Sequence, residues 1–159
     1  MSGLTFAPLD AAAALAVAAW RYPPPYDVYN IADNPAETAL FLAARGRGYY
    51  QLRDGAGELA AFCCFGEEAR VPGGDYSAPA LDVGLGLRPD LTGRGLGRAY
   101  LEATLAFGAA RFGPGASRLT VAAFNARAIR LYTQCGFAEV ARFTSAFGGR
   151  AFIIMARDA

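Results

Sequence analysis

The first candidate for chemistry is a segment near the middle of the chain in which glycine alternates with arginine or leucine. This segment consists of Gly93, Arg94, Gly95, Leu96, Gly97 and Arg98. An apolar run with no helix breaker follows it as far as Phe107, which predicts a helix that starts at the glycines. Glycines let the backbone turn tightly, and unpaired N–H groups at a helix start attract anions. The segment therefore predicts a cradle for a phosphate or pyrophosphate.

Three phosphate-bearing ligands could explain such a loop. A nucleoside triphosphate loop requires a lysine after its last glycine, and this sequence contains no lysine. A dinucleotide loop requires a carboxylate about 20 residues later, but the strand expected at Leu119–Phe124 carries none. Coenzyme A is the third ligand. A flexible connection with no ligand is the plain structural alternative.

A second motif lies downstream, between Asn125 and Phe137. Asn125 is placed to cap a helix, and Ala128, Leu131 and Tyr132 fall on helix-spaced positions. Gly136 is typical of a helix end. A strand, a capped helix and a glycine stop are therefore expected here.

Together the two motifs resemble the GNAT superfamily of acyl-CoA-dependent N-acyltransferases. The family pattern Gln/Arg-x-x-Gly-x-Gly/Ala is similar to Thr92–Gly97, and Asn-x-x-Ala-x-x-Leu-Tyr-x-x-x-Gly-Phe matches 125–137. Thr92 departs from the usual Gln or Arg, which removes a side-chain contact but no backbone amide. The resemblance implies an α/β fold of the α+β type, formed by a single domain over residues 1–159. That fold has a mixed, mostly antiparallel sheet of about seven strands, with about four helices on both faces.

The resemblance also implies an activity and a set of roles. The activity is transfer of an acetyl group from acetyl-CoA, as co-substrate, to a primary amine of a small molecule or peptide. The loop amides at 93–98 would bind the pyrophosphate, with Arg94 and Arg98 adding charge, and Asn125 would bind coenzyme A. The backbone of Leu85, Gly86 and Leu87 would pair with the pantetheine arm. Tyr132 would be the general acid, because a phenol with a pKa of about 10 stays protonated at neutral pH.

The general base is the role with several candidates. Some family members carry a glutamate five residues before the asparagine, where this sequence has Thr120. Asp82, on the strand before the glycine loop, is the nearest carboxylate and the first candidate. Other carboxylates precede that strand: Glu67, Glu68 and Asp75. A water relay is a further alternative.

The strand that carries Asp82 has one nearly bare face. Asp82, Gly84 and Gly86 alternate with larger apolar residues, so one face of the strand presents little side-chain volume. This predicts room for the pantetheine arm and the acceptor. The alternative is that small residues there simply let a helix pack close.

Composition excludes several other classes of protein. The net charge of +1 argues against a nucleic-acid surface, and the absence of histidine excludes histidine metal sites and Ser-His or Cys-His pairs. No cysteine shows metal-ligand spacing, so no metal is expected. The apolar run Ala11–Trp20 is too short for a membrane span. Cys63, Cys64 and Cys135 are expected to be reduced core residues of a cytoplasmic protein.

The remaining elements follow from local patterns. A strand is expected at Gly3–Pro8 and a helix at Leu9–Trp20, and three prolines keep Arg21–Asn30 extended or turning. In the family, the segment after the first helix commonly lines the acceptor site. Further elements are a helix capped by Asn34 that runs to about Arg45, a hairpin of Tyr49–Arg53 with Glu58–Phe65, a loop at Glu67–Ala80, and a closing hairpin of Ala138–Thr144 with Arg150–Ala156.

Two other functions remain open at this stage. A non-catalytic acyl-CoA-binding regulatory module would keep the cradle without the base, as Thr120 permits. A nicotinamide-dependent reductase would bind NAD instead of coenzyme A. Edge strands near the C-terminus make a homodimer plausible.

Overall fold

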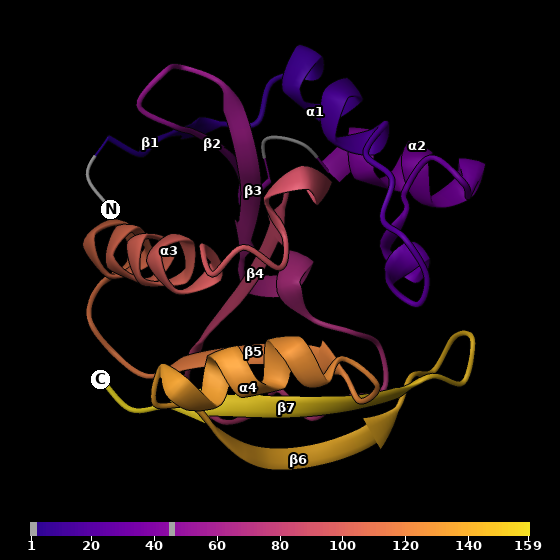
Figure 1. The fold of residues 1–159 in the computed structure, drawn as a ribbon. Helices are drawn as coiled ribbons and strands as arrows, with labels where there is room; N and C mark the ends of the chain where they lie inside the picture. The colour runs from indigo at the N-terminus through magenta and orange to yellow at the C-terminus, as the bar shows by residue number, and fades with distance from the viewer. Residues whose placement is uncertain (1–2, 45–46) are drawn as a thin grey trace. The chain divides into compact units, whose positions relative to one another are not determined.

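A computed structural model describes residues 3–44 and 47–159 of the chain. Seven strands form one mixed sheet in the order β1-β2-β3-β4-β5-β7-β6, and the described residues also form four α-helices (Figure 1). This confirms the predicted fold class. The chain divides into two compact units, and we describe each by itself. Unit 1 is residues 1–64 with 85–99, and unit 2 is residues 65–84 with 100–159. The expectation of a single domain stays a prediction.

Unit 1 contains the N-terminal part of the chain and a segment from its middle. Its elements are β1 (Thr5–Pro8), α1 (Ala11–Ala18), the 3-10 helix η1 (Tyr26–Tyr29), α2 (Pro35–Ala44), β2 (Tyr49–Arg53), most of β3 (Leu59–Phe65), the end of β4 (Leu81–Leu87) and η3 (Pro89–Leu91). β2 pairs antiparallel with β1 and with β3. The bounds of β2 and β3 agree with the predicted hairpin within one residue.

Both helices of unit 1 begin at side-chain caps. Asp10 Oδ1 accepts a hydrogen bond of 2.8 Å from Ala13 N, which satisfies one of the free N–H groups at the start of α1. Asn34 Oδ1 accepts from Glu37 N at 3.2 Å, as the predicted cap requires. The predicted helix end at Arg45 lies outside the described residues. The N–H of Asn34 itself donates to Ile31 O at 3.1 Å, so the main chain supplies the partner that a capping box takes from glutamate.

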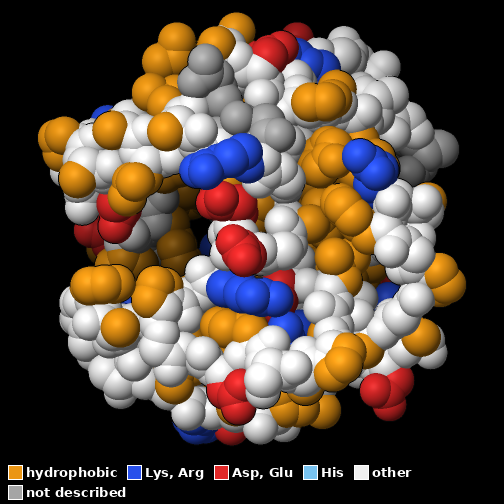
Figure 2. All heavy atoms as spheres, turned by 180° about the vertical axis from the view of Figure 1, so that it is seen from behind, with side chains coloured by type: hydrophobic (Ala, Val, Ile, Leu, Met, Phe, Trp, Pro, Cys, Tyr) orange, Lys and Arg blue, Asp and Glu red, His pale blue; other side chains and the backbone are white. Residues whose placement is uncertain are grey.

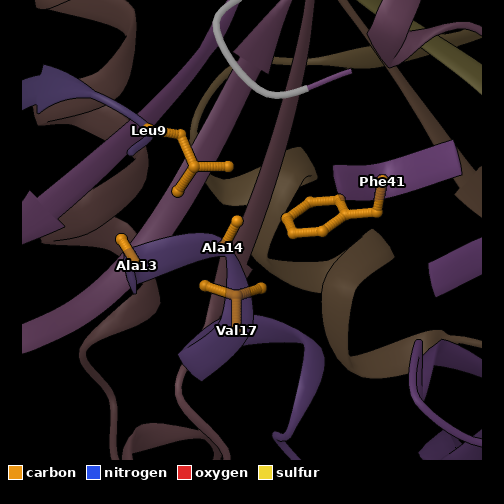
Figure 3. Close-up of a cluster of buried hydrophobic side chains, with 5 residues drawn as sticks. All are labelled: Leu9, Ala13, Ala14, Val17 and Phe41. Carbon is orange, nitrogen blue, oxygen red and sulfur yellow. The ribbon is translucent and has the colours of Figure 1, made fainter. Parts of the chain in front are cut away.

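A small apolar cluster holds α1 and α2 together. Its members are Leu9, Ala13, Ala14, Val17 and Phe41, each at most 7% exposed (Figure 3). Ala13, Ala14 and Val17 share one face of α1 because a helix repeats every 3.6 residues. Leu15, on another face, is 60% exposed. One face of this uniformly apolar helix therefore belongs to the core.

The proline-rich segment after α1 is only partly extended. The three prolines were expected to keep it out of a helix, yet residues 26–29 form η1 directly after Pro25. A single 3-10 turn is compatible with a preceding proline because its first N–H groups need no partner within the turn. Asn30 N closes the turn on Asp27 O at 3.0 Å.

Unit 2 contains the other elements. These are η2 (Gly66–Ala69), the start of β4, most of α3 (Gly97–Phe112), β5 (Ser117–Ala122), α4 (Ala126–Gln134), β6 (Ala138–Thr144) and β7 (Ala151–Arg157). β5 pairs in parallel with β4 and antiparallel with β7. α3 packs closely at Gly108, where an added Cβ would lie 2.7 Å from the Phe65 ring. No helix in the described part of the chain is both long and apolar enough to cross a membrane.

Strand β5 begins and ends two residues earlier than predicted. The prediction of Leu119–Phe124 followed the apolar run, but Arg118 belongs to the strand and Phe124 lies in the turn that follows. Arg118 fits a buried strand position because a carboxylate pairs with it, as described below. The closing hairpin agrees within one residue, but β7 lies between β5 and β6.

One face of the molecule carries charges of both signs. Figure 2 shows one face of the molecule, where arginine and acidic side chains lie interspersed. Neither sign forms a broad field on that face, in keeping with a net charge of +1. This face therefore offers no extended charged surface.

Candidate functional site

The glycine loop of unit 1 has the backbone that the sequence predicted. Gly93 and Gly95 have positive φ values of 71° and 74°, whereas no residue other than glycine has a positive φ in the described chain. A Cβ added at Gly95 would meet nothing within 4 Å, so the loop is open on that side. α3 begins at Gly97. Positive-φ glycines and a helix N-terminus together make an anion-binding backbone.

Side chains before the loop fix its start. Thr92 Oγ1 donates to Pro89 O at 2.7 Å, which closes η3. Arg88 donates to Leu59 O at 2.7 Å and forms an ion pair with Asp90, with Nε and Oδ1 2.6 Å apart. The hydrogen bond from Arg88 lowers the pKa of the exposed Asp90 carboxyl. Thr92, the departure from the family pattern, thus supports the local backbone.

Arg94 and Arg98 both have exposed side chains. Arg94 Nη1 donates to Asp90 O at 3.4 Å, a contact at the long limit of a hydrogen bond. Their guanidinium groups lie on the loop and on the first turn of α3, and they add positive charge where the helix dipole is already positive. This segment is therefore electropositive.

The bare strand face is a correction to the sequence interpretation. A Cβ at Gly86 would collide with the Phe62 ring, so aromatic carbon fills the space predicted for the pantetheine arm at this position. Three rings hold Phe62 in place, with centroid distances of 6.2, 5.7 and 6.3 Å to Trp20, Phe41 and Tyr49. At Gly86 the small residue therefore allows close packing, but of a side chain from β3 and not of the helix that the alternative expected.

The last residue of β4 makes a contact that the sequence did not predict. Leu87 O accepts a hydrogen bond of 2.6 Å from Tyr22 OH, across 65 positions of sequence. Burial raises the pKa of Tyr22 to about 12, so this phenol stays protonated and remains a donor. Arg88 N donates to Ala60 O at 2.8 Å and anchors the next residue. The backbone proposed to hold the pantetheine arm is therefore firmly positioned.

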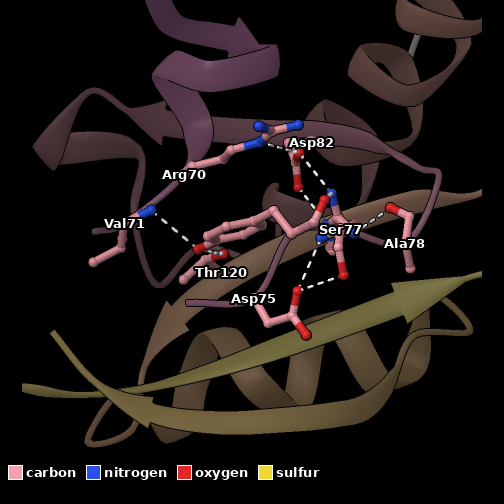
Figure 4. A network of polar contacts seen from close by, with 9 residues as sticks. Arg70, Val71, Asp75, Ser77, Ala78, Asp82 and Thr120 are labelled. Atoms are coloured by element: carbon pink, nitrogen blue, oxygen red, sulfur yellow. Dashed lines mark hydrogen bonds and ion pairs between the residues drawn. The ribbon is translucent and has the colours of Figure 1, made fainter. Parts of the chain in front are cut away.

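Asp82, the candidate base, lies in unit 2 within a buried ion pair. Its Oδ1 accepts from Arg118 Nε at 2.6 Å, and its Oδ2 accepts from Arg118 Nη2 and Arg70 Nε, each at 2.8 Å (Figure 4). Asp82 is 2% exposed and Arg118 is 4% exposed. The hydrogen bonding of Arg118, which donates to Asp82, raises the pKa of the Arg118 guanidinium above its ordinary value. Both carboxylate oxygens are engaged, which is the geometry of a structural pair and disfavours a proton acceptor.

A phenol sits beside this ion pair. The guanidinium carbons of Arg70 and Arg118 lie 5.5 and 5.1 Å from the centroid of the Tyr76 ring. The hydroxyl of Tyr76 lies 2.8 Å from Thr120 Oγ1 and accepts from Val71 N at 3.0 Å (Figure 4). Thr120, at the position of the family glutamate, thus has a hydroxyl partner.

Two other carboxylates of this region, Asp75 and Glu67, are exposed. Asp75 Oδ1 accepts from the Ser77 hydroxyl at 2.6 Å, and that bond lowers the pKa of the exposed Asp75 carboxyl. Glu67 is exposed on η2. Within the described chain, no group of three or more His, Cys, Asp and Glu side chains could hold a metal ion.

Helix α4 carries the two remaining predicted residues. Asn125 is buried and caps the helix, since its Oδ1 accepts from Ala128 N at 3.1 Å. Tyr132 is half-buried, and its ring centroid lies 6.3 Å from that of Phe137. Gly136, with a φ of 90°, ends the helix as predicted. The cap, the glycine stop and the helical position of Tyr132 are thus confirmed.

The predicted residues fall into two groups. Unit 1 contains the glycine loop and Leu85–Leu87, and unit 2 contains Asp82, Asn125 and Tyr132. Sequence reasoning did not identify Tyr22, Tyr76 or Arg118 as partners of these residues. The sequence signal for a buried counter-charge was Arg118, which lies directly before the apolar run Leu119–Phe124.

The fold and the loop define a class of protein, and the sequence profile of a family agrees with it. A mixed seven-stranded sheet with a glycine loop at the start of its third helix is the architecture of N-acetyltransferases. The profile described as the Acetyltransferase (GNAT) family matches residues 14–137. The chain belongs to the GNAT acetyltransferase family and is an enzyme of the acyl-CoA N-acetyltransferase class. No curated protein matches its sequence.

Solved structures share the fold at low sequence identity. A protein described as a GnaT-family acetyltransferase from Bordetella pertussis has a TM-score of 0.73 and 22% identity, over 99% of this chain and 96% of that chain. A spermidine N-acetyltransferase SpeG chimera from Vibrio cholerae and hSSAT has a TM-score of 0.69 and 18% identity, with the same coverage. At these identities the likeness establishes the fold alone.

Proposed function

We propose that this chain transfers an acetyl group from acetyl-CoA to a primary amine by direct attack of the amine on the thioester. The observation that carries the proposal is the pair of positive-φ glycines, Gly93 and Gly95, that lead into α3 within the family match. This backbone supplies N–H groups for a pyrophosphate and needs no lysine. The open space beside Gly95 fits a bulky anion.

The residues proposed to hold acetyl-CoA are of three kinds. The amides of 93–98, with the charges of Arg94 and Arg98, would bind the pyrophosphate. The backbone of Leu85–Leu87 would pair with the pantetheine arm at the strand edge, since Phe62 covers Gly86 on one face. Asn125 would bind coenzyme A near α4 while it caps the helix. The described chain offers no cluster of metal ligands, and we propose no metal.

In the proposed reaction the amine nitrogen bonds to the acetyl carbon as the carbon–sulfur bond breaks. The attacking amine gives up a proton, and the departing thiolate takes one. We assign the second transfer to Tyr132, a half-buried phenol. We assign the first transfer to water, because Asp82 is occupied by two arginines. Asp82 as the base stays an untested prediction, and its contacts count against it.

The acceptor that we propose is a small-molecule amine or a peptide N-terminus. Some solved structures of this fold are named for spermidine, and one is described as a phosphinothricin N-acetyltransferase. These names justify a test panel of polyamines, amino acid analogues and short peptides. Cytoplasmic location and a homodimer are further proposals, the first supported by three buried cysteines, none of which forms a disulfide within the described residues.

The test combines thiol release with a binding measurement. Wild-type protein should release coenzyme A from acetyl-CoA with at least one amine of the panel. Tyr132→Phe should lower kcat by about 100-fold and leave the calorimetric Kd for acetyl-CoA unchanged, because only the proton donor is removed. Unaltered turnover in this variant would refute the role of Tyr132. Tight acetyl-CoA binding without turnover on any amine would favour the non-catalytic module, and binding of NAD in place of coenzyme A would overturn the proposal.

A further inference from the structure

The segment between α1 and α2 is held in one conformation by polar contacts at both of its ends. Tyr22 N donates to Asn30 Oδ1 at 2.7 Å, and Asn30 Nδ2 donates to Asp33 Oδ2 at 2.9 Å. Asn30 is only 7% exposed despite its polar side chain. These bonds close residues 22–30 into a loop, which we call the tyrosine loop.

The tyrosine loop presents apolar side chains outward. Val28 and Tyr29 are 40% and 38% exposed, although each is large and hydrophobic. Tyr29 meets Tyr22 edge to face, with ring centroids 6.5 Å apart and planes at 83°. Exposed apolar groups on a loop with fixed ends are typical of a surface that contacts a ligand.

A single side chain connects this loop to the end of β4. Tyr22 OH donates to Leu87 O at 2.6 Å, and both residues belong to unit 1. Leu87 is the last residue of β4 and lies six positions before Gly93. The loop is therefore fixed to the strand end that the proposed function assigns to the pantetheine arm.

We propose that Tyr22 is a positioning residue that holds the tyrosine loop in place for the acceptor amine through its bond to Leu87. The inference rests on the proposed function, because only an acetyl transfer requires an acceptor beside the arm. Tyr22 itself takes no proton and forms no bond with substrate. Its hydroxyl sets where Val28 and Tyr29 stand relative to the end of β4.

The test is Tyr22→Phe, which removes only the hydroxyl and keeps the ring against Tyr29. Loss of one hydrogen bond should raise the KM for the amine about fivefold. The kcat at saturating amine and the Kd for acetyl-CoA should stay within about twofold, because the glycine loop is unchanged. Tyr49→Phe is the matched control: it makes the same chemical change in unit 1, on β2, and should leave the amine KM unchanged.

A second variant separates positioning from stability. Asn30→Ser removes the other anchor of the loop and should also raise the amine KM. Its effect should be less than additive with that of Tyr22→Phe, because both changes release the same loop. Each variant is assayed below its midpoint of thermal unfolding, so that only folded protein contributes.

The outcomes distinguish this inference from the function on which it rests. A lower melting temperature for Tyr22→Phe with an unchanged amine KM would show that the bond serves stability alone, and the positioning role would be wrong. An equal rise in KM for Tyr49→Phe would also overturn it. If wild-type protein turned over no amine, the proposed function and this inference would fall together.

Discussion

The glycine loop of unit 1 and the Asp82 pair of unit 2 are built in opposite ways. The loop is made from backbone, with positive φ at Gly93 and Gly95 and open space beside Gly95. The pair is made from side chains, with both oxygens of Asp82 bonded to Arg118 and Arg70. A conspicuous carboxylate can therefore be structural, while a segment with few reactive side-chain atoms is the one that we propose for binding.

The largest effect that tests this comparison is expected from Asp82→Asn. The change leaves Arg118 buried and without its counter-charge, which should cost about 3–5 kcal/mol in free energy of unfolding. Urea denaturation measures it. The matched control is Glu139→Gln, which breaks the exposed ion pair with Arg142 and should change the urea midpoint far less.

The same variant also tests the catalytic alternative. The part of the Asp82→Asn protein that stays folded should keep its kcat, because a carboxylate occupied by two arginines takes no proton from the amine. A stable variant with no turnover would restore Asp82 as the base, and the Asp82 pair would then not be purely structural.

A smaller effect is expected from Gly95→Ala in the loop. At a φ of 74° an added Cβ costs about 1–2 kcal/mol, so the loop must change its backbone or hold a strained residue. We expect the calorimetric Kd for acetyl-CoA to rise about tenfold. Gly115→Ala, also in open space but without a positive φ, should leave the Kd unchanged. An unchanged Kd for Gly95→Ala would show that the loop is only a connection.

The smallest effect concerns the dependence of stability on pH, through the buried phenol of Tyr22. The pKa of Tyr22 is raised to about 12 in the folded chain, above its ordinary value of about 10. Its contribution to stability is therefore complete below about pH 10 and is lost as the pH rises towards 12. Urea midpoints at several alkaline pH values should fall less steeply for Tyr22→Phe than for wild type. Equal slopes would contradict the assignment.

Local signals in the sequence predicted the parts of the fold that depend on neighbouring residues. The caps at Asn34 and Asn125 and the stop at Gly136 all agree with the structure. Each depends on contacts within a few residues, which a linear pattern records. The conformation of the glycine loop belongs to the same group.

Distant contacts explain what the sequence could not predict. Phe62 fills the face of Gly86 from 24 positions away, and Tyr22 reaches Leu87 across 65. Arg118 donates to Asp82 across 36 positions. With this partner Arg118 can belong to β5, which therefore starts before the apolar run. Nothing in the residue types near Asp82 or Gly86 shows that a partner occupies them. The sequence was enough to propose the site residues. It could not show which of them are already in contact with distant side chains.

The placement of β7 has a consequence for the order in which unit 2 can assemble. This strand is formed by residues 151–157 and hydrogen-bonds to β5 on one side and β6 on the other. During synthesis, β5 and β6 have no shared neighbour until the ribosome has added these residues. The sheet of the unit that carries Tyr132 therefore cannot close before residues 151–157 are made, and a nascent chain stalled before residue 151 would hold both flanking strands with edges exposed.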